Sequence, residues 1–178
     1  YKRQEELYTL AKENKLVFME AVKTAYCPGF HAMMAAAKSG RIGRIIDVEA
    51  AFSRLTPVNT REYMAQDYNG SFLEFGSYVC MPVFELLGCD YDDVRFNSMR
   101  AVNGVDAYTK AFFSFGGKSA EVKTGLGIKT EGQLLISGTN GYILAKSPWW
   151  LTKEFEVRYE DANKREVYKY SYDGSGLQ

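Results

Sequence analysis

The sequence predicts an α+β fold in which a large, open and mainly antiparallel sheet carries helices on one face. The first observation is residues 71–87, an apolar stretch with only two charges, Glu74 and Glu85. Such a stretch is typical of a helix that is buried almost all round within a larger structure. The second observation is the region 94–172, where short segments suited to strands alternate with turn residues. Because short connections force neighbouring strands to run antiparallel, this region predicts an antiparallel sheet.

Composition places the chain among globular proteins with a large core. Its 178 residues are 46% apolar and 15% aromatic, which is enough for one domain with a fragment of another. The 22 basic and 22 acidic residues cancel and form no basic stripe, which argues against a nucleic-acid partner. The sequence shows no apolar run long enough to span a membrane and no signal peptide, so we expect no membrane partner.

Cysteine and histidine usage limits redox chemistry and metal binding. Cys27, Cys80 and Cys89 are odd in number and lie in apolar surroundings. Free thiols in a reducing cytoplasm therefore fit better than disulfides. The chain has one histidine, His31, and no Cys-x-x-Cys pair. We expect a cytoplasmic protein without a metal site.

The first elements along the chain differ from those that follow. Residues 2–14 repeat apolar positions at helical spacing, and the run Leu16-Val17-Phe18-Met19 is typical of a strand buried on both faces. A helix followed by such a strand predicts the last unit of an α/β domain. Residues 30–39 form a second helix with one apolar face. From Ile45 the apolar period becomes two, which predicts a half-buried strand, and residues 55–69 form a polar loop long enough to be a pocket wall.

The central helix at residues 71–87 comes next, with Ser71 as a suitable N-cap and Gly88 as its end. We expect this helix and the helix at residues 30–39 to cover one face of the sheet. The strands that follow are expected at residues 94–102, 106–115, 120–128, 132–137, 142–147, 151–159 and 165–172.

The opposite face of the sheet is a candidate interface. Several strands carry bulky residues on both sides, among them Phe112 and the row Tyr168, Tyr170 and Tyr172. Aromatic residues mixed with balanced charges on such a face predict two-fold pairing with a second copy. The alternative is that these tyrosines are ordinary strand residues, because tyrosine favours strands.

The candidate chemistry lies on the central helix. Glu74 and Tyr78 are four residues apart, which puts a carboxylate and a phenol on one helix face. Alternatively, Tyr78 is a core residue whose hydroxyl finds one partner, and Glu74 is placed to face the positive end of the helix. Gly125-Leu126-Gly127 lies within strand alternation and fails as a dinucleotide-binding loop.

Three stretches together resemble a known family. They are Glu6-Leu7-Tyr8 to Glu20-Ala21 with Pro28 and Lys38-Ser39-Gly40-Arg41-Ile42-Gly43-Arg44-Ile45, then Gly70 to Gly88, then Gly138-Thr139-Asn140-Gly141-Tyr142-Ile143 with Trp149-Trp150. They resemble the family of glucose–fructose oxidoreductase, inositol dehydrogenase and dihydrodiol dehydrogenase. The resemblance covers nearly the whole chain, and the motifs come in the family's order.

This resemblance implies a two-domain oxidoreductase that uses NAD or NADP and acts on a sugar, polyol or dihydrodiol. Residues 1–22 would be the C-terminal remnant of a dinucleotide-binding Rossmann domain. Residues 23–178 would be the substrate-binding and dimerisation domain, truncated at its C-terminus. The glycine-rich loop and a Glu-Lys-Pro motif whose Lys assists catalysis would lie before Tyr1, so the fragment alone would be inactive. The family also forms homodimers through the open sheet face.

The resemblance also implies the roles of the two site residues. Tyr78 falls where the family has a His or Tyr that exchanges the substrate proton, and Glu74 falls where Asp is usual, so Glu74 would orient or tune Tyr78. An ordinary tyrosine titrates near pH ~10, so a nearby positive charge must activate it as a base. Ala25 stands where related sequences often carry Arg. Two other functions stay open: a catalytically inactive relative acting as a sensor or scaffold, and a stand-alone β-sheet binding module.

Overall fold

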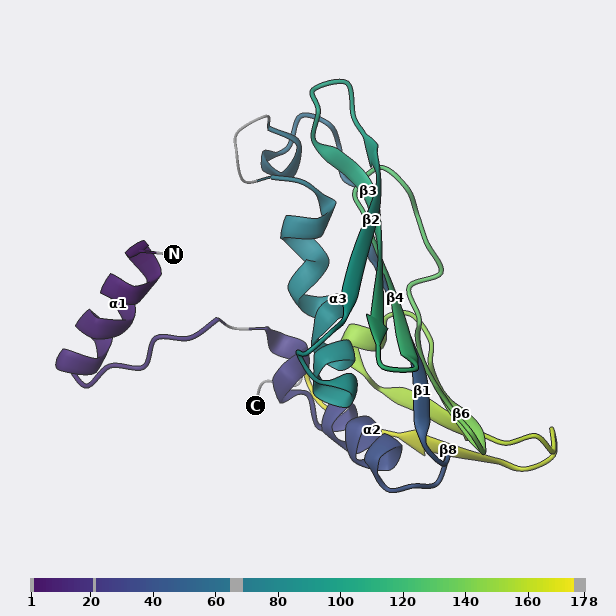
Figure 1. The fold of residues 1–178 in the computed structure, drawn as a ribbon. Coiled ribbons are helices and arrows are strands. Elements are labelled where there is room, and N and C mark those ends of the chain that lie inside the picture. Colours follow the sequence, from purple (N-terminus) through teal and green to yellow (C-terminus); the bar gives the residue numbers. More distant parts are fainter. Residues whose placement is uncertain (1, 21, 65–68, 175–178) are drawn as a thin grey trace.

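One sheet organises the structure, a computed structural model that describes residues 2–20, 22–64 and 69–174 (Figure 1). Across this sheet the strands run in the order β2-β3-β4-β1-β5-β6-β7-β8. Their bounds are β1 Ile45–Ser53, β2 Asp93–Arg100, β3 Asp106–Phe115, β4 Lys118–Gly125, β5 Leu134–Gly138, β6 Gly141–Ala145, β7 Glu154–Arg158 and β8 Arg165–Lys169. The α+β class with an open, mainly antiparallel sheet is confirmed.

The sheet is not a simple meander, because β1 lies in its centre. This strand pairs antiparallel with β5 and parallel with β4. The consecutive strands β4 and β5 are therefore not neighbours, and the β1–β4 pair is an exception to the antiparallel pairing that we predicted. Residues 126–133 between them are long enough to bypass the end of β1. As a result, the carboxyl ends of β1 and β4 lie side by side, with Ser53 opposite Gly125.

The helices of the described residues are α1 Lys2–Glu13, α2 Pro28–Lys38 and α3 Ser71–Leu87, with 3-10 turns η1 Lys23–Tyr26, η2 Arg61–Tyr63 and η3 Trp149–Leu151. As predicted, α2 and α3 lie on one face of the sheet, and the opposite face carries no helix of the described part of the chain (Figure 1). Val79 and Val83 of α3 are fully buried with Val48 and Ala50 of β1 in one core. Burying a side chain such as valine stabilises the fold by about 1.5–3 kcal/mol.

The N-terminus of α3 is capped by a residue from the sheet. We predicted Ser71 as the N-cap, but Ser71 is the first helical residue and Gly70 precedes the helix. The Oδ2 atom of Asp106 accepts hydrogen bonds from the Phe72 N–H at 3.0 Å and from the Ser71 hydroxyl at 2.7 Å. Gly70 has a φ of 128°, and a Cβ there would lie 1.7 Å from Asp106 Oδ1. Only glycine fits this turn, which brings the capping carboxylate to the positive end of the helix.

The N-terminal segment exposes apolar surface. The predicted helix forms as α1, whereas the predicted buried strand at Leu16–Met19 does not form, because no other strand of the described residues lies beside it. All four of its side chains are exposed, Val17 by 87%. Figure 1 shows α1 standing apart from the sheet. The only aromatic pair of the described part of this segment joins Tyr8 to Phe18.

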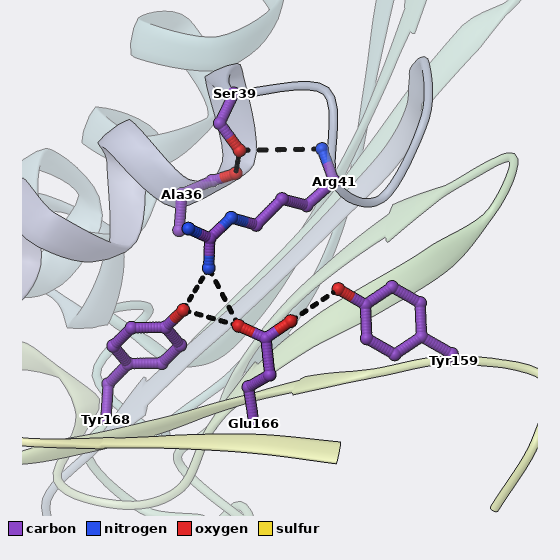
Figure 2. A network of polar contacts seen from close by, with 6 residues as sticks. All are labelled: Ala36, Ser39, Arg41, Tyr159, Glu166 and Tyr168. Carbon is purple, nitrogen blue, oxygen red and sulfur yellow. Dashed lines mark hydrogen bonds and ion pairs between the residues drawn. The ribbon is translucent and has the colours of Figure 1, made fainter. Parts of the chain in front are cut away.

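A polar network ties the edge strand β8 to the end of α2, as Figure 2 shows. Arg41, just after α2, donates to Glu166 Oε2 at 2.7 Å and to the Tyr168 hydroxyl. The hydroxyls of Tyr168 and Tyr159 donate to Glu166 at 2.6 and 2.8 Å. These two hydrogen bonds, with the Arg41 charge, lower the pKa of the Glu166 carboxyl. Glu166 and Tyr168 therefore face the helices.

The tyrosine row lies on the helix-bearing face, so our prediction that it lines the opposite face is wrong. Phe155 of β7 is buried in the core and stacks on Tyr168 and Tyr170, with ring centroids 4.7 and 6.2 Å apart. Tyr172 packs against the same core. Because alternate residues of a strand face opposite ways, the register of β8 fixes this whole row. Of the four aromatic residues we predicted for the open face, only Phe112 of β3 lies there, between buried neighbours of the other face.

Candidate functional site

The two predicted site residues lie in the first half of α3, beside the carboxyl end of β1. Tyr78 is half-buried, and its ring meets the ring of Phe52 edge-on with centroids 5.3 Å apart. Its hydroxyl makes no hydrogen bond within the described residues. The Tyr78 side chain is thus held by its ring against Phe52, and its hydroxyl has no assigned role in the packing of the described residues.

Three rings from three elements form an aromatic stack beside Tyr78. Phe52 of β1 stacks on Phe75 of α3 at 4.4 Å and, on its other side, on Trp150 of η3 at 3.8 Å. The neighbouring Trp149 is fully buried, and its Nε1–H donates to the Ala51 carbonyl at 2.8 Å. That hydrogen bond holds η3 against β1 and so places Trp150 on Phe52. Stacked aromatic rings of this kind add to the packing energy and fix η3 and α3 at the end of β1.

Four charged side chains form an ion-pair cluster at the same end of α3. Glu74 Oε1 lies 3.8 Å from Arg54, and Glu74 Oε2 lies 3.6 Å from Arg61. Arg54 also pairs with Glu62 at 3.1 Å, and its guanidinium lies over the Phe75 ring at 5.6 Å. The cluster carries two positive and two negative charges, so it is neutral as a whole.

A small polar cavity of about 140 Å³ lies within this cluster. Its walls come from the turn before α3, from α3 and from η2: Arg61, Glu62, Asn69, Gly70, Leu73 and Glu74. The pKa of Glu62 is lowered by hydrogen bonds from its own backbone N–H and from Thr60, and further by the charges of Arg54 and Arg61. The Glu62 carboxyl is therefore charged at neutral pH.

The structure does not bring Glu74 and Tyr78 into contact. Their spacing places both on one side of α3, as predicted, yet no hydrogen bond joins them in the described part of the chain. Both carboxylate oxygens of Glu74 face guanidinium groups instead. Helical spacing fixes which residues are neighbours, but the partner of a long side chain depends on charges contributed by other segments.

The described residues hold no evident place for a metal or a dinucleotide. Nowhere among them do three or more His, Cys, Asp or Glu side chains gather as a metal site requires. In the Gly125-Leu126-Gly127 stretch, the Leu126 and Gly127 N–H groups both donate to the Ala107 carbonyl, at 2.8 and 3.0 Å. These donors are already used, so this stretch does not fit a pyrophosphate. No helix of the described residues has the length and apolar character of a membrane span.

Sequence reasoning missed most residues of this site. The predicted pocket-wall loop at residues 55–69 does lie here, through η2 and Asn69, although residues 65–68 lie outside the described residues. Phe52, Phe75 and Arg54 carried no signal, because each is an ordinary residue of a strand, helix or loop until the fold brings them together. Trp150 was noticed only within a motif of the family resemblance.

Two curated relatives match nearly the whole chain. One is scyllo-inositol 2-dehydrogenase (NADP(+)) IolU of Bacillus subtilis (strain 168), 26% identical over 174 residues, which cover 93% of this chain and 52% of that protein. The other is trans-1,2-dihydrobenzene-1,2-diol dehydrogenase of Bos taurus, 26% identical over 159 residues, which cover 87% of this chain and 47% of that protein. The chain thus spans about half the length of these relatives. No family model matches it.

Solved structures share the fold. A 3-ketoreductase of Actinomadura kijaniata in complex with NADP and TDP-benzene matches with a TM-score of 0.75 and 20% identity, over 93% of this chain and 52% of that one. Levoglucosan dehydrogenase in complex with NADH and levoglucosan matches with a TM-score of 0.74 and 17% identity, over 99% of this chain and 54% of that one. The resemblance inferred from the sequence is confirmed: the chain is related to the inositol and dihydrodiol dehydrogenases and has the fold of the C-terminal domain of their oxidoreductase family.

Proposed function

We propose that this chain is the substrate-binding and dimerisation part of an NAD(P)-dependent oxidoreductase that acts on a sugar, a polyol or a dihydrodiol. The observation that carries the proposal is the position of Tyr78, whose ring packs edge-on against the aromatic stack of Phe52, Phe75 and Trp150 at the carboxyl end of β1. The names of the relatives support the reaction class, since they are dehydrogenases of an inositol and of a dihydrodiol. The neutral ion-pair cluster next to the stack suits an uncharged substrate.

Residues 1–22 would belong to a separate nucleotide-binding domain, and residues 23–178 to the substrate domain. The support is the apolar surface of the N-terminal segment. Leu7 and Leu10 of α1 are exposed, as is the whole run Leu16–Met19. Exposed apolar surface of this extent costs free energy in water, so further strands and helices of such a domain would cover it.

Tyr78 would exchange a proton with the reacting oxygen of the substrate. Oxidation of an alcohol carbon requires loss of its hydroxyl proton, and reduction requires that a proton be supplied. The Tyr78 hydroxyl can act in both directions because a phenol can donate a proton and a phenolate can accept one. The stack would hold the apolar face of the substrate ring at its side. Glu74 would take no direct part in this proton exchange, since both of its carboxylate oxygens face guanidinium groups.

The nicotinamide cofactor, NAD or NADP, would be bound by residues outside this chain. The described residues do not fit it, because the only glycine pair at strand spacing, in Gly125-Leu126-Gly127, has its N–H donors engaged by Ala107. The chain alone would therefore be inactive. The free Cys27, Cys80 and Cys89 fit a reducing cytoplasm.

The test uses the intact protein that carries this chain, with sugars, polyols and a trans-dihydrodiol as substrates and NAD or NADP as cofactor. Absorbance of the reduced nicotinamide reports turnover. Tyr78→Phe removes only the hydroxyl, so the variant should fold while kcat falls by about 10²–10⁴-fold. Tyr91→Phe is the matched control, since Tyr91 is a half-exposed tyrosine after α3 that stacks on Phe84; its kcat should stay unchanged.

A loss of less than tenfold in Tyr78→Phe would give Tyr78 a packing role and remove the proposed mechanism. Micromolar binding of NAD or NADP to the isolated 178-residue chain would contradict the assignment of the cofactor to another segment. An intact protein that binds a polyol but turns over none of the substrates would point to a sensor or scaffold instead.

A further inference from the structure

We propose that Glu74 is a positioning residue that fastens the 54–64 segment onto α3 by pairing with Arg54 and Arg61. The effect of this fastening on a substrate rests on the proposed function, whereas the fastening itself does not. It gives Glu74 a role different from orienting or tuning Tyr78, which is the role that the family resemblance implies.

Both oxygens of the Glu74 carboxylate are committed to the 54–64 segment. Oε1 lies 3.8 Å from Arg54, which directly follows β1, and Oε2 lies 3.6 Å from Arg61, which begins η2. Glutamate has one methylene more than aspartate, and this length lets one side chain on α3 reach two guanidinium groups of the segment. No contact of comparable kind joins Glu74 to Tyr78 within the described residues.

The segment has its own anchors on either side of the ion pairs. Arg54 is held twice more, by Glu62 at 3.1 Å and by the Phe75 ring at 5.6 Å. Tyr63 is buried against Phe75, and its carbonyl accepts a hydrogen bond from the Asn103 side chain at the β2–β3 turn. Between these anchors the segment carries exposed apolar residues such as Val58, whose side chains add little packing energy to hold the segment against the fold. Through its ion pairs with Arg54 and Arg61, Glu74 therefore holds the part of the segment between Arg54 and Tyr63 against α3.

The fastened segment completes one wall of the candidate site. Arg54 covers the Phe75 ring, which is the outer ring of the stack. If Glu74 is lost, Arg61 loses its ion pair and is free to move over the polar cavity, while Arg54 keeps only Glu62 and the Phe75 ring as partners. Release should therefore weaken substrate binding, because the wall is no longer preorganised, while Tyr78 itself is untouched.

The pairs are partly exposed, with 56% of the Arg54 side chain and 78% of the Arg61 side chain accessible. Exposed ion pairs are individually weak and are screened by salt. The expected effect of losing Glu74 is therefore modest, local and dependent on ionic strength. An effect with this size, this local extent and this dependence on ionic strength is what loss of the Glu74 ion pairs predicts.

Hydrogen exchange of single backbone amides in the 178-residue chain tests the proposal. The Tyr63 and Met64 N–H groups donate to Thr60 and Arg61 carbonyls, both at 3.1 Å, and report opening of the segment. Glu74→Gln should make both amides exchange about two- to fivefold faster at low salt. High salt should raise the wild-type rates to those of the variant. Arg61→Gln should act in the same way, and the double variant should add nothing further.

Glu85→Gln is the matched control. Glu85 lies on the same helix and pairs with Lys38 at 3.0 Å, but it does not touch the segment. Its replacement should leave Tyr63 and Met64 unchanged. Equal exchange in wild type and Glu74→Gln, or equal acceleration by Glu85→Gln, would overturn the proposal without bearing on the oxidoreductase function.

Kinetics of the intact enzyme distinguish a Glu74 that fastens the 54–64 segment from a Glu74 that tunes Tyr78. Glu74→Gln should raise KM several-fold while kcat stays within about twofold and its pH profile does not move. A tenfold fall of kcat with a displaced pH profile would return Glu74 to a role on Tyr78 and overturn the inference.

Discussion

Burial decides which of the three thiols can react. Cys89 is exposed after α3, Cys80 faces the interior of the helix layer, and Cys27 is fully buried before α2. Burial raises the pKa of the Cys80 thiol to about 12. At pH 8 only about one Cys80 in ten thousand is then the reactive thiolate.

We therefore expect iodoacetamide at pH 8 to modify Cys89 first, with Cys80 and Cys27 protected as long as the fold persists. Peptide mass spectrometry over time measures the three rates. In concentrated urea the three rates should converge, because the folded structure and not the local sequence protects Cys80 and Cys27 from modification. Modification of Cys80 as fast as Cys89 in the folded chain would refute the burial argument.

At this scale the sequence was informative only where chemistry follows from local spacing. Glu74 and Tyr78 were predicted to share a helix face, and they do. Their contacts were beyond reach, because Arg54 and Arg61 approach Glu74 from a loop with no regular period. The same holds for Asp106, which caps α3 from a strand that begins far along the chain.

The cap of α3 leads to a prediction at the scale of elements. Asp106 Oδ2 accepts from Ser71, from the Phe72 N–H and from the Thr109 hydroxyl, the last at 2.8 Å. Asp106→Ala should lower the free energy of unfolding by about 1–2 kcal/mol, because the first turn of the helix loses its acceptor. Asp106→Asn keeps one oxygen and should lose less. Urea unfolding measures both.

Asp161→Ala is the control for this cap. Asp161 accepts from the Asn163 N–H at 2.9 Å in an exposed turn, so its loss should cost less than about 0.5 kcal/mol. Similar losses for Asp106→Ala and Asp161→Ala would show that the α3 cap is dispensable.

The bounds of helices and strands can be predicted from the apolar period and the turn residues. Which strands and helices lie next to one another cannot. The helix at residues 71–87 and the strand at residues 106–115 were predicted with the bounds that the structure has. Alternation along β8 showed that its two faces differ, but not which face the helices cover. The tyrosine row was accordingly assigned to the wrong side. β1 enters the centre of the sheet because of long-range pairing, for which the local sequence carries no signal.

For the whole molecule, one face of the sheet is left uncovered by the helices of the described residues (Figure 1). Ion pairs cross it, such as Lys110 with Glu121 at 3.0 Å and Arg158 with Glu156 at 2.6 Å. Glu156 is only 6% exposed although no helix of the described residues covers it. Internally paired charges keep such a face soluble, and their pairing offsets part of the desolvation cost of burying them against a second copy.

We propose that two copies pair through this face, and its centre provides the test. Leu135 of β5 lies opposite Leu144 of β6 and next to Glu49 of β1, with its side chain directed away from the helices. Leu135→Glu would place two like charges at the centre of a two-fold interface. Within one chain the new carboxylate would also face Glu49, a like-charge pair that costs about 0.2–1 kcal/mol and should leave the fold intact.

Light scattering at micromolar concentration should give a dimer for the wild-type chain and a monomer for Leu135→Glu, with unchanged far-ultraviolet circular dichroism. Leu73→Glu is the matched control, because Leu73 is 62% exposed on α3, on the helix-bearing side; it should stay dimeric. A monomeric wild type would end the dimer proposal. A dimer that resists Leu135→Glu but dissociates with Leu73→Glu would move the interface to the helices, where the rest of the oxidoreductase is expected to lie.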